Sequence, residues 1–183
     1  MLFRSSQKAK VTVGTRFWDS VILRTNWWEN LSRVIAEVPI YLRVCWLKSL
    51  ISGWTTSHRM HETNKLDCIF GCDADDQFLH YLICPCLWSL ANQFFGGEEA
   101  VTSSERMCLQ APSVVKLQRL AMVHAIYHTC KRDHTCVEGA WVASPFLIQG
   151  KALGVARDVS HIVRYRIQSE STNLLVSHSA VPR

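Results

Sequence analysis

The chain has 183 residues, of which 48% are hydrophobic and 19% are charged, with seven tryptophans against only eight glycines and five prolines. This composition excludes a disordered or collagen-like chain and provides enough apolar surface for one compact domain with tails. The longest apolar stretch, residues 34–51, is interrupted by Glu37, Arg43 and Lys48, so it falls short of the roughly 18 apolar residues that a membrane helix needs. We therefore expect a soluble protein without a membrane partner.

The net charge of +5 is divided unevenly along the chain. Residues 1–66 carry a net +6, residues 67–112 a net −6 and residues 113–183 a net +5. Basic flanks of this size are either solvated surface or a means of contacting the phosphates of RNA or DNA. Contacts with nucleic acid are therefore expected from the two flanks and not from the acidic middle block.

Apolar spacing predicts helices through the first part of the chain. Residues 17–34 follow a loose helical pattern, and a sharper pattern follows at steps of three and four residues: Ile40, Val44, Leu47, Ile51 and Trp54. This pattern predicts a helix from about Pro39 to Gly53 whose apolar stripe faces the core. A short helix carrying residues 58–61 is expected next, capped by the hydroxyl groups of residues 55–57.

The most informative segment contains four metal-ligating side chains in one short run. Its pattern is C-x3-C-x7-H-x3-C, formed by Cys68, Cys72, His80 and Cys84. Three thiols and one imidazole complete the tetrahedral shell that a structural Zn²⁺ prefers, and two close pairs joined by a short connector are the usual arrangement. A closed shell predicts a scaffold and not a catalyst. Cys86 is a rival fourth ligand.

Local geometry suits this interpretation. Gly71 is predicted to provide the tight turn that aims the first two thiolates at one metal. A helix from about Asp76 would place His80 and Cys84 on one face, and the aspartates near its start suit the positive end of its dipole. Pro85 is predicted to end that helix.

Eight cysteines also allow two other interpretations, namely buried free thiols or the disulfides of a secreted protein. Residues 1–14 lack the apolar core and small-residue cleavage site of a secretion signal. We therefore expect an intracellular, reducing compartment, with nucleus and cytoplasm not distinguished. In such a compartment close Cys/His pairs favour a metal.

The second half of the chain is again expected to be helical. Helices are predicted over residues 87–95, over 113–131, and over 142–166 with a break at Pro145 or Gly150. The fold class is thus mainly α, a small helical domain organised around a Cys-Cys-His-Cys zinc knuckle with further helices C-terminal to it. The expected organisation is a basic flexible lead-in (1–15), a helical zinc-binding module (16–97), a polar connector (98–112), a helical C-terminal region (113–168) and a flexible tail (169–183).

A set of short motifs in a fixed order carries a resemblance to a known family. The set comprises Val38-Pro39, the segments 43–50 and 53–60, the Cys68/Cys72 and His80/Cys84 pairs, Pro85 and Trp88. It resembles the zinc-binding region downstream of the reverse transcriptase in non-LTR retrotransposons, over about fifty residues. The resemblance implies zinc on the quartet, helices packed around it, and a role in handling the RNA or DNA target of the element.

The chain departs from the family in two respects. Many members have two residues between the first Cys pair and four between the His and the last Cys, where this chain has three and three. That difference leaves the choice between Cys84 and Cys86 open. No polymerase or endonuclease motif accompanies the module, so we expect a non-enzymatic protein, either a detached or remnant reading frame or a host protein derived from one.

Other constellations carry less weight. Ala74-Asp75-Asp76 resembles a polymerase aspartate pair, but it lies between zinc ligands and lacks the strand hairpin that a two-metal site requires. A second group of His and Cys side chains allows another metal site, although partly buried histidines beside loosely placed thiols are favoured. Its members are His124, His128, Cys130, His134 and Cys136. Trp54 and Trp88 are expected in the core.

The leading expectation is a non-catalytic zinc-binding module of retrotransposon reverse-transcriptase origin whose basic flanks contact RNA or DNA. The alternatives are a zinc-stapled protein-interaction scaffold, a non-functional retroelement remnant and a small zinc enzyme with a metal-bound water. The candidate phosphate-binding residues are Arg43, Lys48, Arg59 and Lys65.

Overall fold

The structure is a computed structural model of the chain. It describes residues 27–57, 59–60, 66–96, 102–132, 136–137, 140–141 and 144–178. For Trp27, for the two short strands and for residues 163–178, it describes the backbone only.

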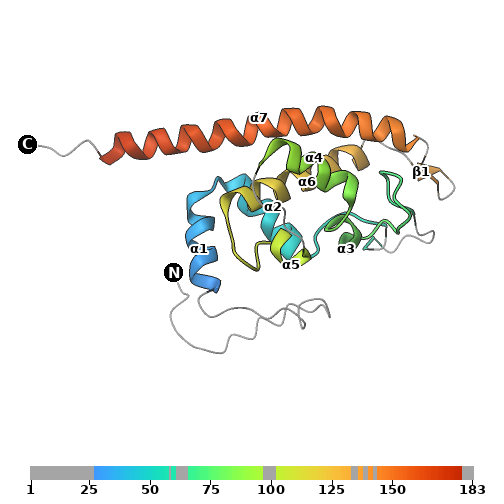
Figure 1. Cartoon of the computed structure of the whole chain (residues 1–183), viewed down its shortest axis with the longest axis horizontal. Helices are drawn as coiled ribbons and strands as arrows, with labels where there is room; N and C mark the ends of the chain where they lie inside the picture. Colours follow the sequence, from blue (N-terminus) through green and yellow to red (C-terminus); the bar gives the residue numbers. More distant parts are fainter. Residues whose placement is uncertain are drawn as a thin grey trace, which may run out of the picture.

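The fold is mainly helical, as predicted (Figure 1). The helices are α1 (Trp27–Glu37), α2 (Ile40–Leu50), α3 (Phe78–Tyr81), α4 (Pro85–Phe94), α5 (Ser103–Arg106), α6 (Val114–Arg132) and α7 (Pro145–His178). Two short antiparallel strands, β1 (Cys136–Val137) and β2 (Ala140–Trp141), pair Cys136 with Trp141. Among the described residues, the length and hydropathy needed to cross a membrane do not occur together in any helix.

Helix α6 is the centre of the packing. It contacts α1, α2, α4, α5 and α7, and α7 also contacts α4. Figure 1 shows α7 lying across α4 and α6 and extending past the rest of the molecule toward the C-terminus. One continuous apolar core includes Leu42 of α2, Leu87 of α4, Leu120 of α6 and Ala156 of α7. It also includes Ile69 of the loop at residues 68–77, which we call the cysteine loop. The segment that contains the predicted ligands and the C-terminal helices therefore share one core.

Helix α2 lies where the sequence predicts a helix, but it is rotated relative to the expectation. Pro39 is its N-cap residue. After the helix ends at Leu50, the chain turns through Ser52, which adopts a positive φ of 52°. The predicted stripe faces solvent at four of its five positions: Ile40, Val44, Leu47 and Ile51. The opposite face is buried: Leu42, Cys45, Trp46 and Ser49. The helix is apolar on two faces, so periodicity alone could not decide which face the core would take.

The remaining differences concern residues 102–178. Helix α7 begins at Pro145, which suits a first helical turn, and continues through Gly150 without the predicted break. It also runs into the 169–183 stretch that was expected to be a tail. The stretch expected to be a polar connector contains α5, capped by a reciprocal Thr102–Glu105 box, and the buried segment 107–109. Residues 1–15, His58 and His61 lie outside the described residues.

Candidate metal centre

The first half of the centre is a tight loop that begins at Cys68. The Cys68 amide donates to the carbonyl of Ala74 (2.7 Å), and the Gly71 amide donates to the carbonyl of Cys68 (2.9 Å). Gly71 has a φ of 80°, a left-handed conformation that glycine adopts without strain. The predicted glycine turn is therefore confirmed, and it brings the thiols of Cys68 and Cys72 to the same side of the loop.

The second half comes from two helices and not from one. His80 lies in the single turn of α3, whereas Cys84 is the N-cap residue of α4 and Pro85 occupies the first turn of that helix. Pro85 was predicted to end a helix that contains both ligands. Instead, its fixed φ and missing N–H suit the start of a new helix, so the chain changes direction between the ligands. This change of direction brings the Cys84 thiol beside the first pair.

The four predicted ligands converge. One ligand atom from each of Cys68, Cys72, His80 and Cys84 lies within 4.8 Å of all the others. The Sγ atoms of Cys72 and Cys84 are 3.6 Å apart. Cys68, His80 and Cys84 are buried, and Cys72 is partly buried. The group can hold one metal ion with four protein ligands.

The electrostatics of the cluster favour a bound cation. Hydrogen bonding with the Cys84 thiol lowers the pKa of Cys68 to about 4, although burial opposes this effect. The same hydrogen bond, together with burial, raises the pKa of Cys84, and burial raises the pKa of Cys72 to about 11. Three thiols this close, two of them buried and one partly buried, cannot all ionise unless a cation balances them. A divalent ion would supply that balance and deprotonate its ligands.

The imidazole of His80 contains a buried nitrogen, Nε2, without a hydrogen-bond partner in the described part of the structure, as do those of His124 and His128, but only His80 belongs to the converging quartet. Leaving a buried polar nitrogen unpaired costs about 1–3 kcal/mol, and such groups in native proteins generally have a partner. A metal ion at the centre of the quartet would be that partner.

Cys86 occupies a different environment from Cys84. Its Sγ lies 3.9 Å from the carbonyl oxygen of Phe70 and 3.8 Å from Gln149 Nε2. It is not part of the converging group, since the fourth ligand position is filled by Cys84. The geometry therefore favours Cys84 as the fourth ligand.

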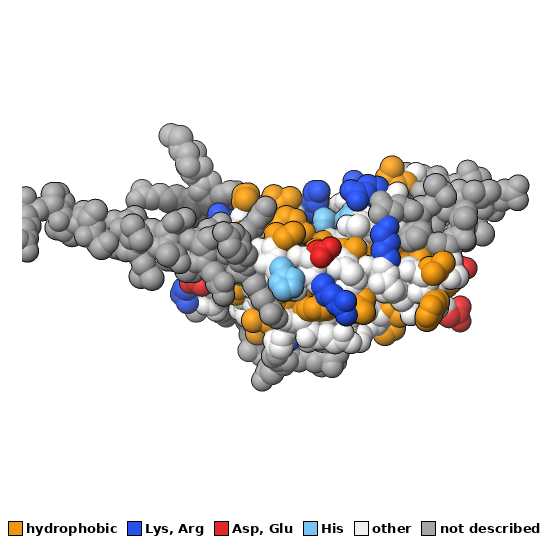
Figure 2. Space-filling model, turned by 90° about the horizontal axis from the view of Figure 1, so that it is seen from above, with side chains coloured by type: hydrophobic (Ala, Val, Ile, Leu, Met, Phe, Trp, Pro, Cys, Tyr) orange, Lys and Arg blue, Asp and Glu red, His pale blue; other side chains and the backbone are white. Residues whose placement is uncertain are grey.

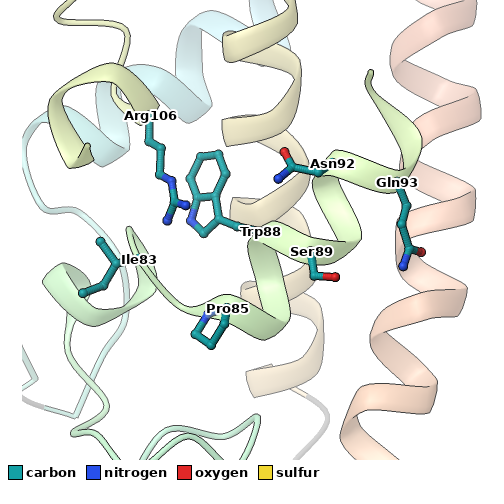
Figure 3. A pocket seen from close by; sticks show the side chains of 7 residues that line it. All are labelled: Ile83, Pro85, Trp88, Ser89, Asn92, Gln93 and Arg106. Atoms are coloured by element: carbon teal, nitrogen blue, oxygen red, sulfur yellow. The ribbon is translucent and has the colours of Figure 1, made fainter. Parts of the chain in front are cut away.

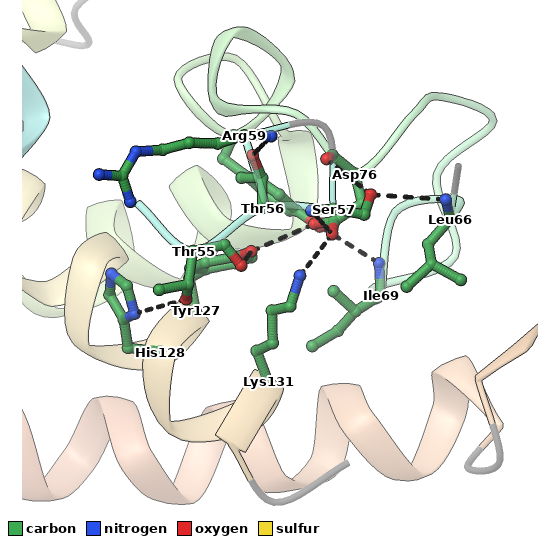
Figure 4. Close-up of polar contacts among 11 residues, drawn as sticks. Thr55, Thr56, Ser57, Arg59, Leu66, Ile69, Asp76, Tyr127, His128 and Lys131 are labelled. Atoms are coloured by element: carbon green, nitrogen blue, oxygen red, sulfur yellow. Dashed lines mark hydrogen bonds and ion pairs between the residues drawn. The ribbon is translucent and has the colours of Figure 1, made fainter. Parts of the chain in front are cut away.

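A buried carboxylate ties the cysteine loop to α6 (Figure 4). Asp76 Oδ2 accepts hydrogen bonds from the Ser57 amide (2.7 Å) and from Lys131 Nζ (2.6 Å), which also forms an ion pair with it. Its Oδ1 accepts from the hydroxyls of Tyr81 (2.6 Å) and Tyr127 (3.2 Å). Sequence reasoning placed Asp76 at a helix start facing the dipole, and that role is wrong because α3 begins two residues later and the carboxylate points into the protein.

Trp54 forms the apolar side of the same junction. It is fully buried, as predicted, and its ring lies 5.2 Å from that of Tyr127, 5.5 Å from that of Phe78 and 6.3 Å from that of Tyr81, between ring centroids. Its Nε1 donates to Ser49 Oγ of α2 (3.0 Å). The residue therefore joins α2, α3 and α6 directly beside the candidate metal centre.

Helix α7 holds the loop from another side. Gln149 Nε2 donates to the carbonyl of Phe70 (2.9 Å). A Cβ atom added to Gly71 would lie 2.7 Å from Pro145 Cβ, so the loop and the start of α7 approach as closely as glycine allows. Sequence reasoning missed this contact, because no local pattern relates residues so far apart along the chain.

The second Cys/His group does not form a comparable centre among the described residues. The rings of His124 and His128 are tilted by 49° with centroids 4.2 Å apart, and their Nδ1 atoms lie 3.6 Å from Cys45 Sγ and 3.4 Å from Thr55 Oγ1, respectively. Burial lowers the pKa of His124 to about 3 and that of His128 to about 4, so both imidazoles are neutral at pH 7. Of the other members of the predicted group, Cys130 is buried in the core, and His134 and the Cys136 side chain lie outside the described residues.

The predicted phosphate-binding residues have different surroundings. Arg43 is engaged at the end of α1, where its Nε donates to the carbonyl of Val38 (2.8 Å) and its guanidinium to that of Ala36 (3.1 Å). Lys48 and Arg59 are exposed, and Lys65 lies outside the described residues. In Figure 4 the Arg59 side chain points away from the Asp76 network.

An open hollow lies beside α4 (Figure 3). Its volume is about 630 Å³, and its walls include Ile83, Trp88, Asn92 and Arg106. The Arg106 guanidinium lies 4.5 Å from the centre of the Trp88 ring and donates to the carbonyl of Leu82 (2.9 Å). The lining contains no carboxylate, imidazole or thiol, so its described residues provide no general acid or base.

Comparisons of the chain with known protein families, with curated proteins and with solved structures gave no match. The function of the centre must therefore follow from its own residues and geometry.

Proposed function

We propose that Cys68, Cys72, His80 and Cys84 hold one structural Zn²⁺ ion. The observation that carries this proposal is the closed, largely buried set of three thiols and one imidazole whose His80 Nε2 has no other partner among the described residues. Thiolate and imidazole together suit Zn²⁺, whereas Mg²⁺ and Ca²⁺ prefer oxygen ligands. Four protein ligands leave no open coordination position, so the ion serves folding and not catalysis.

The ion would fasten three segments that contribute little regular structure by themselves. The cysteine loop supplies two ligands, and the single turn of α3 and the start of α4 supply one each. In zinc-finger peptides such binding contributes about 10–16 kcal/mol to folding. Zinc would thereby keep Trp54 and Asp76 in contact with α6. The protein is then a zinc-stapled helical module in which the surrounding helices carry the functional surfaces.

Metal analysis of matched variants tests this assignment. Protein purified in reducing buffer is expected to contain one zinc per chain, and its Co²⁺ form should show the absorption of a tetrahedral thiolate site. Cys84→Ser should lose the metal, whereas Cys86→Ser should retain it because its thiol lies outside the quartet. Absence of stoichiometric zinc from the native chain, or equal metal loss in both variants, would show the assignment to be wrong.

We further propose that the module contacts RNA or DNA through Lys48 and Arg59. The specific support is that both cations are exposed to solvent. Cations on a rigid surface can bind phosphate without regard to sequence. The order of motifs that resembles the zinc-binding region of retrotransposon reverse transcriptases supports the same interpretation.

Salt dependence distinguishes this role from ordinary surface charge. Binding of a labelled RNA or DNA oligonucleotide to the zinc-loaded chain should weaken as the salt concentration rises. The double variant Lys48→Gln/Arg59→Gln should reduce the slope of log affinity against log salt concentration by about one for each phosphate that is no longer neutralised. Arg157→Gln, an exposed cation of α7, is the matched control and should leave the slope unchanged. Binding that is undetectable or insensitive to salt would exclude the nucleic-acid role and leave the zinc assignment intact.

A further inference from the structure

The outer face of α2 exposes four large apolar side chains in one row. We define this outer face as Ile40, Val44, Leu47 and Ile51, which are 67%, 40%, 50% and 62% exposed. Large apolar side chains that gather on one exposed face, unlike scattered ones, mark interaction surfaces. The face shown in Figure 2, by contrast, mixes charged, histidine and apolar side chains.

The spacing of this row fits another helix. Steps of four, three and four residues correspond to alternating a and d positions of a heptad repeat, the seam along which two helices pack. The core-facing residues of α2 occupy the opposite side, so α2 is already fixed in position and presents its seam outward. The row covers about three helical turns, roughly 16 Å, which a partner of two to three heptads would cover.

The charges that border the row distinguish a second copy of this chain from other binding partners. Arg43 and Lys48 lie on opposite sides of it, at g-type and e-type positions, and α2 contains no acidic residue. A second copy packed in parallel would place Arg43 against Lys48, and an antiparallel copy would place each cation against its own counterpart. Both arrangements set like charges together, so the surface disfavours its own copy.

We propose that the outer face of α2 docks an amphipathic helix of a protein partner whose apolar seam is bordered by Asp and Glu. Acidic flanks on the partner would face Arg43 and Lys48 and give the contact its selectivity. A lipid surface fits less well, because two cations beside a short apolar row provide little attraction to anionic lipid. The proposal does not depend on the identity of the metal.

The test uses two synthetic helical peptides with the same three-heptad apolar seam, one with Glu and one with Lys at the e and g positions. Fluorescence anisotropy with the full, zinc-loaded chain should show saturable binding of the acidic peptide and at least about tenfold weaker binding of the basic one. Leu47→Glu should abolish binding. Phe146→Glu, which alters a side chain of α7 that is 83% exposed, should leave it unchanged.

Charge inversion keeps the proposal testable even where Leu47→Glu affects folding. Lys48→Glu should weaken binding of the acidic peptide and strengthen binding of the basic one, whereas Arg59→Glu should change neither. Far-UV circular dichroism and zinc content establish that each variant is folded. The proposal is overturned if neither peptide binds or if both bind equally. It is also overturned if the native chain self-associates in sedimentation, or attaches to anionic vesicles, and Leu47→Glu abolishes that behaviour.

Discussion

Replacing Asp76 by Asn probes the junction that joins the candidate metal centre to α6. In the described structure four donors surround the carboxylate: the backbone amide of Ser57, the hydroxyls of Tyr81 and Tyr127, and the ammonium of Lys131. An amide keeps one acceptor oxygen and turns two N–H donors toward the other pair of donors. Asp76→Asn should therefore leave part of the network unsatisfied in either orientation of the amide.

The expected cost follows from the burial of the ion pair. The Asp76 side chain is completely buried, and that of Lys131 is only 14% exposed. Removing one partner of a buried pair costs about 3–5 kcal/mol, since the remaining charge loses its compensation. The tyrosine hydroxyls can rotate to accept hydrogen bonds from the new amide, so we expect the lower end, about 3 kcal/mol of unfolding free energy.

Urea unfolding followed by circular dichroism at saturating zinc measures this cost. Asp75→Asn is the matched control, because that side chain is exposed in the same loop and its replacement should change stability by no more than about 0.5 kcal/mol. A double-mutant cycle with Lys131→Met isolates the pair and should give a coupling of about 1–3 kcal/mol. Equal effects of Asp76→Asn and Asp75→Asn, or strictly additive effects in the cycle, would refute the assigned role of the network.

Substitutions at four further positions test other parts of the structure. Gly71→Ala should destabilise the protein by about 2–3 kcal/mol and weaken zinc binding, because the residue has a positive φ and its new methyl group would meet Pro145. Gly154→Ala in α7, where a new methyl group would meet nothing within 4 Å, should instead stabilise the protein by about 0.5–1 kcal/mol. Similar effects of the two substitutions in thermal unfolding would contradict this account. The depressed pKa values of His124 and His128 mean that the unfolded chain binds more protons below about pH 6.5, so stability should fall by about 2 kcal/mol for each histidine between pH 7 and pH 5. Replacing both by Asn should flatten that dependence in urea titrations at several pH values, and an unchanged slope would show that other groups cause it.

The candidate metal centre was predictable because its four predicted ligands lie close together in the sequence. Cys68 and Cys84 are sixteen positions apart, and the features that bring them together locally, a glycine turn and a proline-initiated helix, are visible in the sequence. Helix α6 was predictable for a similar reason, since local spacing determines that a long helix forms. The division of the second ligand pair between α3 and α4 could not be predicted, because Pro85 is equally consistent with the end of one helix and the start of the next.

The orientation of α2 and the role of Asp76 depend on residues far along the chain. The core face of α2 is selected by packing against α6, and Trp46 Nε1 donates to the carbonyl of Met107, a contact across sixty-one positions. Asp76 meets Lys131 across fifty-five positions. A single sequence carries no periodic signal for pairs of this kind, so the residues that fix the centre in the fold are harder to predict than the ligands themselves.

These long-range contacts distinguish the centre from a free-standing zinc finger. The cysteine loop is joined to α6 through Asp76 and to α7 through the Gln149–Phe70 hydrogen bond, and Trp54 packs between α2 and α6. Metal loss should therefore perturb all three helices together, because the apolar core is continuous from α2 to α7. Hydrogen exchange on zinc-free protein should show lower protection along α6 and the first turns of α7 as well as in the loop. A decrease in protection confined to the loop would mean that the metal stabilises an independent unit.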